Sequence, residues 1–341
     1  MSKVSIKDVA KYAGVSISTV SRVLHQYKNV PEETRNKVLA AVRELNYTPN
    51  YIAQSMTRGR TKNIGVVFST SAENAFVDPF YPEVLRGIGH KTQNYGYYIQ
   101  LLAFDDPIRE KEECLKLLQC GRVDGLILLK SRMYDSLIYE LNKNNHKFVL
   151  IGQVSDEYPI NGTVYSVDTD NKMGSYKLVS YLIQKGHKRI AFIMGNREHV
   201  VDNERYKGYR LAHMDGGLEC DPELVIESPT YTHELKDVIK DKLRKIKGIT
   251  AIFARDDMKA VAAMFAVSDL GLRVPEDVVV AGYNNYLVST LIEPKLTTVN
   301  VPVYDLGVQA AQLMIDLIEG RKIKENRIIL PVELIERRST G

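Results

Sequence analysis

The longest part of the 341-residue sequence, from Asn63 to the C-terminus, alternates short apolar runs with helical patterns. The runs include IGVVFS, YYIQLLAF, GLILLKS, KFVLIGQ, RIAFIMG, TAIFAR and VVVAGYN. Strands that alternate with helices are typical of a parallel sheet covered by helices on both faces. The alternation occurs in two successive series, which predicts two similar α/β halves. The last runs, LTTVNV and RIILPVELIERR, are too short for a third core, so we expect them to return to the first two.

Ahead of this region, residues 6–24 contain two short helical patterns joined at Gly14. In the first pattern apolar residues recur at helical spacing, and Ser5 followed by Asp8 forms a capping-box pair. Glycine permits the backbone reversal, and Ser16 can cap the second helix. The pattern predicts a helix-turn-helix whose second helix reads DNA. The inward stripe of that helix consists of Val20, Val23 and Leu24.

The outward face of the second helix supports DNA binding over plain packing. Two helices joined by glycine also occur in ordinary helical hairpins. Here the outward face carries small hydroxyls and one arginine, which suit base edges and phosphates. Residues 1–62 carry a net charge of +7, whereas the remainder carries −3, as expected for a polyanion-binding head on a neutral body. We expect DNA contacts from Ser16, Ile17, Ser18, Thr19, Ser21, His25 and, as guanine reader, Arg22.

A third helix is predicted to begin after Pro31, because proline and early acidic residues favour a helix start. Its core stripe would close a three-helix headpiece over residues 1–48. Residues 49–61 then form a linker that is proline-started and potentially helical rather than Gly/Ser-rich. The expected core stripe of the third helix is Val38, Ala41, Val42 and Leu45.

The string VSIKDVAKYAGVSISTVSRVLH resembles the N-terminus of the lactose/galactose repressor (LacI/GalR) family of bacterial transcription regulators. The resemblance continues in NYTPNYIAQSM, GHKRIAFIMG, GLRVPEDVVVAGYNN and PKLTTVNVP. It implies that the linker folds into a hinge helix on operator DNA, with Asn50, Ala53 and Met56 at the minor groove. Met56 falls where the family places an apolar wedge, often leucine, and methionine is a softer wedge. Alternatively, Ala53 and Met56 pack the linker against the body.

The resemblance also implies a type I periplasmic-binding-protein architecture, in which the chain crosses between two lobes three times. We place the crossings near Asn161, Pro294 and Lys322. The effector-binding and dimerisation domain then spans residues 62–341, with ligand between the lobes at the carboxyl ends of the strands. The first lobe would comprise residues 62–161 and 295–322, and the second residues 162–294 and 323–341.

Four candidate ligand residues follow strands of the first half. Ser131 and Gln153 follow the third and fourth strands and could donate hydrogen bonds to ligand hydroxyls. Phe80 and Tyr81, in the string DPFY, could offer an aromatic floor to a sugar. An aromatic residue at a helix start can equally pack into the core.

Three further ligand positions come from the resemblance. Arg205, in NERYKGYR, matches a family arginine that binds ligand hydroxyls or carboxylates, although it could instead form a salt bridge between the lobes. Asp256 matches an Asn/Asp ligand position, whereas Asp257 is expected to cap the next helix. Asn284 stands where the family commonly has aspartate, which lowers the charge of the pocket and suits a neutral polyol.

Several other functional classes are disfavoured. The three cysteines have neither zinc-like spacing nor a disulfide framework, so we expect reduced thiols, no metal and no cofactor. The N-terminus lacks the apolar region of a signal peptide and no apolar run could span a bilayer, which predicts a soluble cytoplasmic protein rather than a secreted sugar-binding protein. Dinucleotide-loop, Walker A and serine-elbow motifs are absent, and the adjacent Asp256 and Asp257 diverge, so an enzyme is not expected.

The sequence therefore predicts a homodimeric transcription repressor that binds a near-palindromic operator and is released by a small effector. The strings GLILLKSRMYDSLIYELNKNNHKFVLIGQV and YSVDTDNKMG resemble repressors of maltose operons in Gram-positive bacteria. This implies a neutral sugar, with maltose or maltodextrin favoured. The alternative is a catabolite-control-type regulator whose DNA binding is tightened by a phosphorylated carrier protein or a purine corepressor.

Overall fold

The computed structural model describes residues 4–24, 27, 29–48, 60–157, 160–228 and 235–341. Its contacts divide the chain into two compact units, Met1–Thr61 and Lys62–Gly341. We describe the headpiece in the first unit and the body, which is the second unit, each by itself. Among the helices of the described residues, none combines the length and the apolar character needed to cross a membrane.

The headpiece has the three predicted helices, α1 (Ile6–Ala13), α2 (Ile17–Leu24) and α3 (Glu32–Glu44). Gly14 ends α1 in the left-handed conformation with φ +65°, which glycine adopts without steric cost. The Ser5 backbone N–H donates to Asp8 Oδ2 over 2.8 Å in a capping box. The helix-turn-helix prediction is thus confirmed. The helices enclose a small core of Val9, Ala10, Val20, Val23, Val30, Val38 and Ala41.

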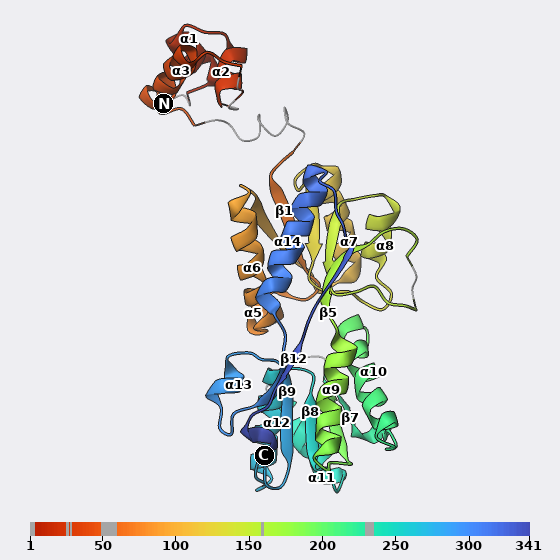
Figure 1. The fold of residues 1–341 in the computed structure, drawn as a ribbon. Helices are drawn as coiled ribbons and strands as arrows, with labels where there is room; N and C mark the ends of the chain where they lie inside the picture. The colour runs from red at the N-terminus through yellow and green to blue at the C-terminus, as the bar shows by residue number, and fades with distance from the viewer. Residues whose placement is uncertain (1–3, 25–26, 28, 49–59, 158–159, 229–234) are drawn as a thin grey trace. The chain divides into compact units, whose positions relative to one another are not determined.

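The first lobe of the body, the N-lobe, is built on a six-stranded sheet in which every neighbouring pair of strands is parallel. In sheet order the strands are β11 (Arg327–Leu330), β5 (Tyr165–Thr169), β4 (Phe148–Ile151), β3 (Gly125–Leu128), β1 (Asn63–Phe68) and β2 (Tyr98–Ala103). Helices cover both faces (Figure 1). They are α6 (Phe80–Asn94) and α14 (Val303–Glu319) on one face and α7 (Pro107–Gln119) and α8 (Ser136–Lys143) on the other, with the short α5 (Ala72–Val77) beside α6.

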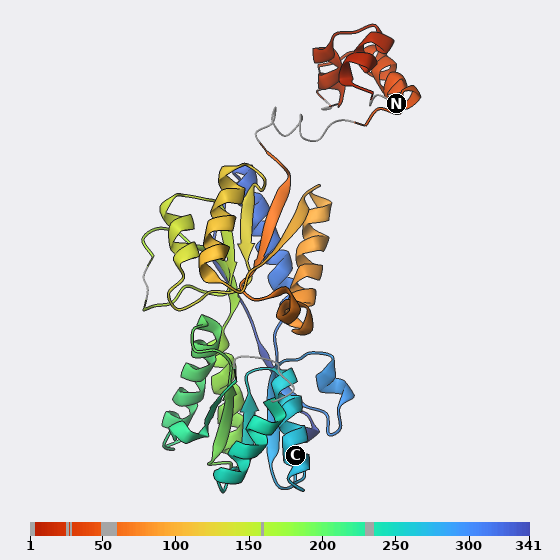
Figure 2. The same ribbon diagram turned by 180° about the vertical axis from the view of Figure 1, so that it is seen from behind.

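The second lobe, the C-lobe, repeats this plan. Its sheet order is β12 (Glu333–Ile335), β10 (Thr297–Asn300), β9 (Val279–Asn284), β8 (Ala251–Ala254), β6 (Ile190–Met194) and β7 (Val225–Glu227). Only β12 runs antiparallel to its neighbour. Helices α9 (Asn171–Gln184) and α10 (Val200–Asp215) pack together on one face, and α11 (Leu235–Lys245) and α12 (Asp257–Asp269) on the other (Figure 2). The remaining short helices are η1 (Pro222–Leu224), α13 (Val288–Leu291) and η2 (Arg338–Thr340).

The chain crosses between the lobes three times, but each crossing lies later than the sequence predicts. Strands β5, β10 and β11 each pair with a strand of the lobe that the chain is leaving. The crossings therefore follow these strands, at residues 170, 301–302 and 331–332. An apolar run indicates a strand but does not say which of two similar sheets the strand joins. The predicted positions to be corrected are Asn161, Pro294 and Lys322, with the lobe boundaries drawn from them.

Helices α6 and α14, far apart in the sequence, pack at very close range on the N-lobe. A Cβ atom at Gly87 would lie 2.1 Å from the carbonyl oxygen of Tyr304, and one at Gly307 would lie 2.2 Å from that of Val84. Only glycine fits at these two points of contact. Although α14 follows the C-lobe strands in sequence, it completes the N-lobe.

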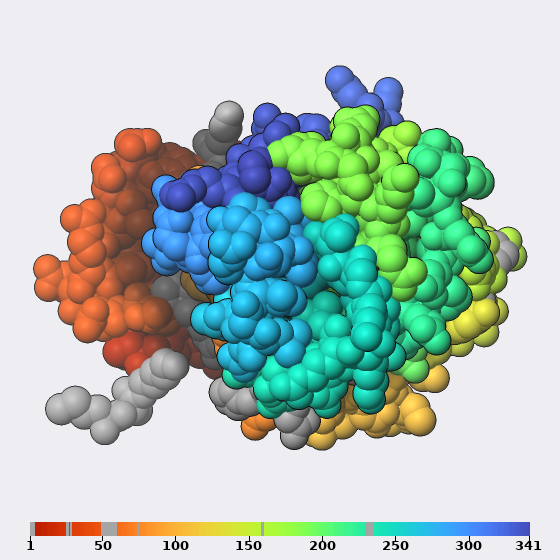
Figure 3. All heavy atoms as spheres, turned by 90° about the horizontal axis from the view of Figure 1, so that it is seen from below, coloured from red at the N-terminus to blue at the C-terminus, as the bar shows by residue number. Residues whose placement is uncertain are grey.

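The C-terminus is anchored in the C-lobe by buried hydroxyl groups. The Ser339 hydroxyl donates to the carbonyl of Val280 over 2.6 Å and accepts from the Thr297 N–H over 2.8 Å. The hydroxyls of Tyr181 and Thr340 lie 3.0 Å apart. Figure 3 shows the C-terminal residues, in dark blue, against α9, in light green.

Candidate functional site

The outward face of α2 carries the residues that the sequence predicts to contact DNA. Ser18 and Arg22 are exposed, Ile17 is 44% exposed, and Thr19 and Ser21 are half-buried. The opposite face of α2 packs into the headpiece core. The helix is thus anchored by apolar side chains and presents hydroxyls and a guanidinium outward.

Ser16 caps α2 as predicted. The Thr19 backbone N–H donates to Ser16 Oγ over 3.1 Å, and Ser16 Oγ lies 2.7 Å from Ser18 Oγ. These contacts fix the first turn of the reading helix. The other predicted DNA contacts, His25, Asn50, Ala53 and Met56, lie outside the described residues.

A cavity of about 80 Å³, which we call the inner cavity, lies between the two lobes of the body. It is lined by residues at the carboxyl ends of strands from both sheets, as expected for this architecture. Six of the seven predicted ligand residues line it, namely Phe80, Tyr81, Ser131, Gln153, Arg205 and Asn284. The sequence reasoning missed seven polar residues of the same wall, which are Asp78, Lys130, Asp168, Thr169, Asn171, Arg255 and Tyr286.

Asp256, the seventh predicted ligand residue, does not line the inner cavity. Its side chain is fully buried and accepts a 2.9 Å hydrogen bond from a backbone N–H in the first turn of α12, so it caps that helix. Asp257, the predicted cap, instead accepts from the Tyr286 N–H and the Thr298 hydroxyl, both over 2.6 Å. Arg255 is the residue of this segment that reaches the cavity.

The guanidinium of Arg205 is held by neutral groups of the C-lobe. It donates to Asn171 Oδ1 over 3.0 Å, to Asn284 Oδ1 over 3.2 Å and to the carbonyl of Arg255. It also lies 3.8 Å from the centre of the Tyr283 ring, a cation–π distance. Among the described residues Arg205 forms no ion pair, so the alternative of an interlobe salt bridge is not realised.

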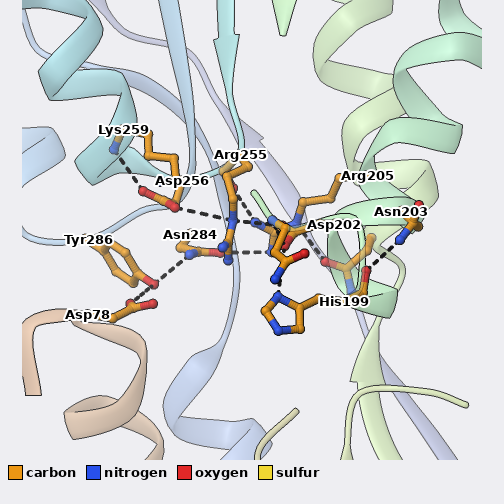
Figure 4. A network of polar contacts seen from close by, with 12 residues as sticks. Asp78, His199, Asp202, Asn203, Arg205, Arg255, Asp256, Lys259, Asn284 and Tyr286 are labelled. Atoms are coloured by element: carbon orange, nitrogen blue, oxygen red, sulfur yellow. Dashed lines mark hydrogen bonds and ion pairs between the residues drawn. The ribbon is translucent and has the colours of Figure 1, made fainter. Parts of the chain in front are cut away.

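The charge of Arg255 is compensated behind the cavity wall. Its Nε lies 3.0 Å from Asp202 Oδ1 and 3.4 Å from Asp256 Oδ2 (Figure 4). Burial would raise the pKa of Asp202, but the charge of Arg255 and a hydrogen bond from His199 outweigh it and hold this pKa below its usual range. Burial lowers the pKa of His199 to about 4, so its imidazole is neutral at pH 7. The positive charge of Arg255 is therefore fully compensated by the two carboxylates beside it.

The N-lobe side of the cavity supplies an acid and a base. Burial raises the pKa of Asp168 to about 6 and lowers that of Lys130 to about 8. Asp168 Oδ1 accepts from the Thr169 N–H over 2.8 Å and from Asn171 Nδ2 over 3.1 Å. The wall thus presents both donors and acceptors, which suits a ligand rich in hydroxyl groups.

The remaining predicted N-lobe residues are partly engaged in the protein itself. The Ser131 hydroxyl donates to the carbonyl of Gln153 over 2.6 Å, and Gln153 Oε1 accepts from Arg327 over 2.5 Å. Tyr81 is 5% exposed, and its ring centre lies 5.3 Å from that of Phe68. Tyr81 therefore belongs to the N-lobe core as well as to the cavity wall, so both sequence interpretations describe part of its role.

A side-chain hydrogen bond joins the lobes at the cavity. The Tyr286 hydroxyl of the C-lobe donates to Asp78 Oδ1 of the N-lobe over 3.1 Å, and it accepts from Asn284 Nδ2 over 2.7 Å (Figure 4). Asn284 has φ +97°, a conformation that is costly for a residue with a Cβ and that is found mainly at functional sites.

Backbone hydrogen bonds join the lobes at a second place. Residues 131–133, which follow β3, pair with residues 198–200 at the start of α10. The Met133 N–H donates to the carbonyl of Glu198 over 2.7 Å, and the Val200 N–H donates to that of Ser131 over 3.2 Å. We call these two segments the interlobe bridge.

The fold and the two sites define a class of protein, a DNA-binding regulator with a two-lobed small-molecule-binding body. Residues 5–50 match the bacterial regulatory proteins of the lacI family, and residues 179–340 match the periplasmic binding protein-like domain. The HTH-type transcriptional regulator RegA of Clostridium saccharobutylicum is 38% identical over 340 residues, which cover 98% of this chain and 99% of RegA.

Two solved structures extend the comparison. A CelR–cellobiose complex is 33% identical with a TM-score of 0.76, covering 99% of this chain and 100% of that one. The lac repressor dimer bound to operator and the anti-inducer ONPF is 28% identical with a TM-score of 0.86, covering 99% of each chain. The protein therefore belongs to the lacI family of bacterial transcription regulators. It is a DNA-binding regulator that responds to a small effector and not an enzyme.

Proposed function

We propose that this regulator is a homodimeric repressor of a sugar-utilisation operon and that a small neutral sugar releases it from its operator. The observation that carries the proposal is the wall of the inner cavity, to which both lobes contribute hydrogen-bonding groups. A sugar that contacts both lobes would favour one relative position of the lobes over another. Such a difference in affinity between two states is what couples a ligand to DNA release.

The charges of the wall favour a neutral ligand. The guanidinium of Arg255 is paired with Asp202, and that of Arg205 is occupied by neutral acceptors. Lys130 shares the wall with the carboxylates of Asp78 and Asp168. A phosphate or carboxylate ligand would have to compete with these acids. The CelR complex contains cellobiose, a neutral sugar. Maltose and maltodextrin are the candidates that the sequence resemblance favours for this chain.

The proposed dimer would use exposed apolar side chains of the body. Leu287, directly before α13, is 74% exposed, and Leu291, the last residue of α13, is 71% exposed. On the edge strand β2, Tyr98 is 65% exposed and Leu101 is 44% exposed. Exposed apolar patches of this kind mark interaction surfaces, and the lac repressor relative is a dimer on its operator. The proposed occupant is a second copy of this chain.

On DNA, each α2 would lie in a major groove, with Ile17, Ser18 and Arg22 at the bases. The linker would act as a hinge in the minor groove, with Asn50, Ala53 and the wedge Met56. Two-fold symmetry then requires a near-palindromic operator. A shift of the lobes caused by sugar would move the two hinges apart and weaken binding.

Operator binding by fluorescence anisotropy tests the proposal. The DNA is taken from upstream of the gene's own neighbourhood, and the salt concentration is fixed because it changes affinity strongly. Maltose, maltodextrins, cellobiose, monosaccharides and purines are titrated in turn. Release by a sugar supports the proposal. Tightening by a purine or a phosphorylated carrier protein, without release by any sugar, would contradict it and select the corepressor alternative.

A further inference from the structure

The interlobe bridge lines two cavities rather than one. Ser131 and its neighbour Lys130 line the inner cavity, whereas Arg132, Met133 and Glu198 line a second cavity of about 610 Å³, which we call the outer cavity. The lining changes from the inner to the outer cavity between Ser131 and Arg132, which are joined to residues 198–200 by the backbone hydrogen bonds of the bridge. The bridge can therefore act as the partition between the two cavities.

The inner and outer cavities differ in the size of ligand that they can accommodate. Pockets that enclose a ligand usually measure about 300–1,000 Å³, and the inner cavity, at about 80 Å³, is below this range and leaves room for one sugar ring at most. The outer cavity, at about 610 Å³, lies within it. An effector of more than one sugar ring would find the additional room beyond the bridge.

The outer cavity has the chemistry of a carbohydrate subsite. Tyr134, 66% exposed, offers an aromatic ring whose face can stack on the C–H face of a sugar. The carboxylates of Glu157 and Glu198 and the amide oxygen of Asn203 can accept hydrogen bonds from sugar hydroxyls. The amide nitrogen of Asn203 already donates to the carbonyls of Arg197 and His199. An aromatic surface with a few planar polar groups around it is the usual composition of a ligand pocket.

One wall of the outer cavity is rigidly held. Arg132 forms a 2.7 Å ion pair with Glu110, whose side chain is 2% exposed. Glu110 also accepts from the Ser69 hydroxyl over 2.8 Å. The Arg132 backbone N–H donates to Asp135 Oδ2 over 3.1 Å. These contacts fix the loop that carries Tyr134, so its ring is presented from an ordered support.

We propose that the outer cavity is a second subsite of the effector site, and that the effector is therefore an oligosaccharide of at least two rings. This inference rests on the proposed function. One ring would occupy the inner cavity and the next would stack on Tyr134. Because the bridge separates the cavities, its backbone hydrogen bond between Met133 and Glu198 must open when such a ligand spans both.

Isothermal titration calorimetry on the full-length protein tests the second subsite with two series of sugars of increasing length. One series is glucose, maltose and maltotriose, and the other is glucose, cellobiose and cellotriose. We expect a di- or trisaccharide of one ladder to bind at least about tenfold more tightly than glucose. Tyr134→Ala should weaken the oligosaccharide about tenfold and leave glucose unchanged, whereas Tyr134→Phe, which keeps the ring, should retain most of the affinity. Tyr139→Ala is the matched control, because Tyr139 is an exposed tyrosine of α8 that lines neither cavity and lies outside the proposed dimer surface.

The outcomes separate this inference from the proposed function. Equal affinity for mono- and oligosaccharides would overturn the second subsite while leaving a sugar effector in place. A preference for oligosaccharides that survives Tyr134→Ala undiminished would overturn its assignment to the outer cavity. An equal loss for glucose and for oligosaccharides would also overturn it, because the variant would then act on the inner cavity. Binding of no sugar at all would contradict both proposals.

Discussion

The hydroxyl of Tyr286 in the C-lobe lies 3.1 Å from Oδ1 of Asp78 in the N-lobe, in a hydrogen bond that joins the lobes across the cleft. The two residues are 8% and 9% exposed. Asn284 donates to the same hydroxyl, and Arg205 donates to Asn284. The contact between the lobes and the polar wall of the inner cavity therefore form one continuous chain of hydrogen bonds.

This chain predicts that Tyr286→Phe lowers effector affinity. Without the hydroxyl, Asp78 and Asn284 each lose a hydrogen-bond partner and the closed cleft loses an interlobe contact. We expect a loss of about 1 kcal/mol, or about fivefold to tenfold in affinity, measured by calorimetry. Tyr139→Phe removes a hydroxyl outside the cleft and serves as control. Unchanged affinity in Tyr286→Phe would show that this bond does not contribute to ligand binding.

In the headpiece, Arg22→Ala is expected to lower operator affinity by about 1–3 kcal/mol, the usual contribution of a bidentate arginine–guanine contact. The loss on a scrambled duplex should be smaller, because that DNA offers no specific base contact. Anisotropy titrations at one salt concentration measure both. Lys37→Ala is the control, since Lys37 is an exposed base of α3 that pairs with Glu33. Equal losses on operator and scrambled DNA would assign Arg22 to phosphate binding.

For the proposed hinge, Met56→Pro should abolish operator binding. Proline removes a backbone N–H and breaks a helix interior, at a cost of about 3 kcal/mol or more. The same anisotropy assay reports the result, and effector affinity of the variant verifies that the body is intact. Operator affinity equal to that of the wild type would refute the hinge.

The stability of the body should depend on pH through Asp168. Burial raises the pKa of its carboxyl from 3.8 to about 6. Between about pH 4 and 6 the folded protein keeps a proton that the unfolded chain has lost, so this group makes the free energy of unfolding fall as pH rises through that window. Above about pH 6 Asp168 is ionised in both the folded and the unfolded chain, so its contribution to the free energy of unfolding no longer changes with pH.

Asp168→Asn removes this titration and keeps an oxygen for the Thr169 N–H and the Asn171 amide. At pH 7 we expect the variant to be more stable than the wild type by up to about 3 kcal/mol, and at pH 4 the gain should nearly vanish. Urea unfolding of both proteins at pH 4 and pH 7 measures this difference in the free energy of unfolding. A gain that is the same at both would show that the titration of Asp168 is not its source.

For the proposed dimer, a double substitution at the two ends of α13, Leu287→Asp with Leu291→Asp, should yield monomers in analytical ultracentrifugation. Two carboxylates in an apolar interface are strongly disfavoured. Loss of the dimer should also lower operator affinity, because each subunit binds one half-site of the operator. Met214→Asp, at a 68% exposed position of α10, is the control. A double variant that stays dimeric would exclude α13 from the interface.

The sequence predicts the headpiece well because its signals are local. The spacing of Val20 and Val23, the capping pair Ser5 and Asp8 and the left-handed Gly14 all act within one or two helical turns. The alternation of strands and helices in the body is equally local. What the sequence could not place were the crossings between lobes, because β5 and β10 have the same apolar pattern whichever sheet they join.

Local sequence patterns are also insufficient to predict which single side chains line the inner cavity. The string RDD follows β8, and only the backbone direction at its end decides that Arg255 reaches the cavity while Asp256 turns back to cap α12. Asp78 and Tyr286 are 208 residues apart. No local pattern joins them, so their contact emerges only from the packing of the two lobes.

The close contact between Gly87 of α6 and the backbone of α14 has a consequence for synthesis on the ribosome. When the strands up to β10 have emerged, the N-lobe sheet still lacks both α14 and its edge strand β11. A nascent chain of that length exposes one apolar face of its first-made lobe. The N-lobe cannot finish folding before the C-lobe has been translated, so the two lobes mature together rather than in the order in which they are made.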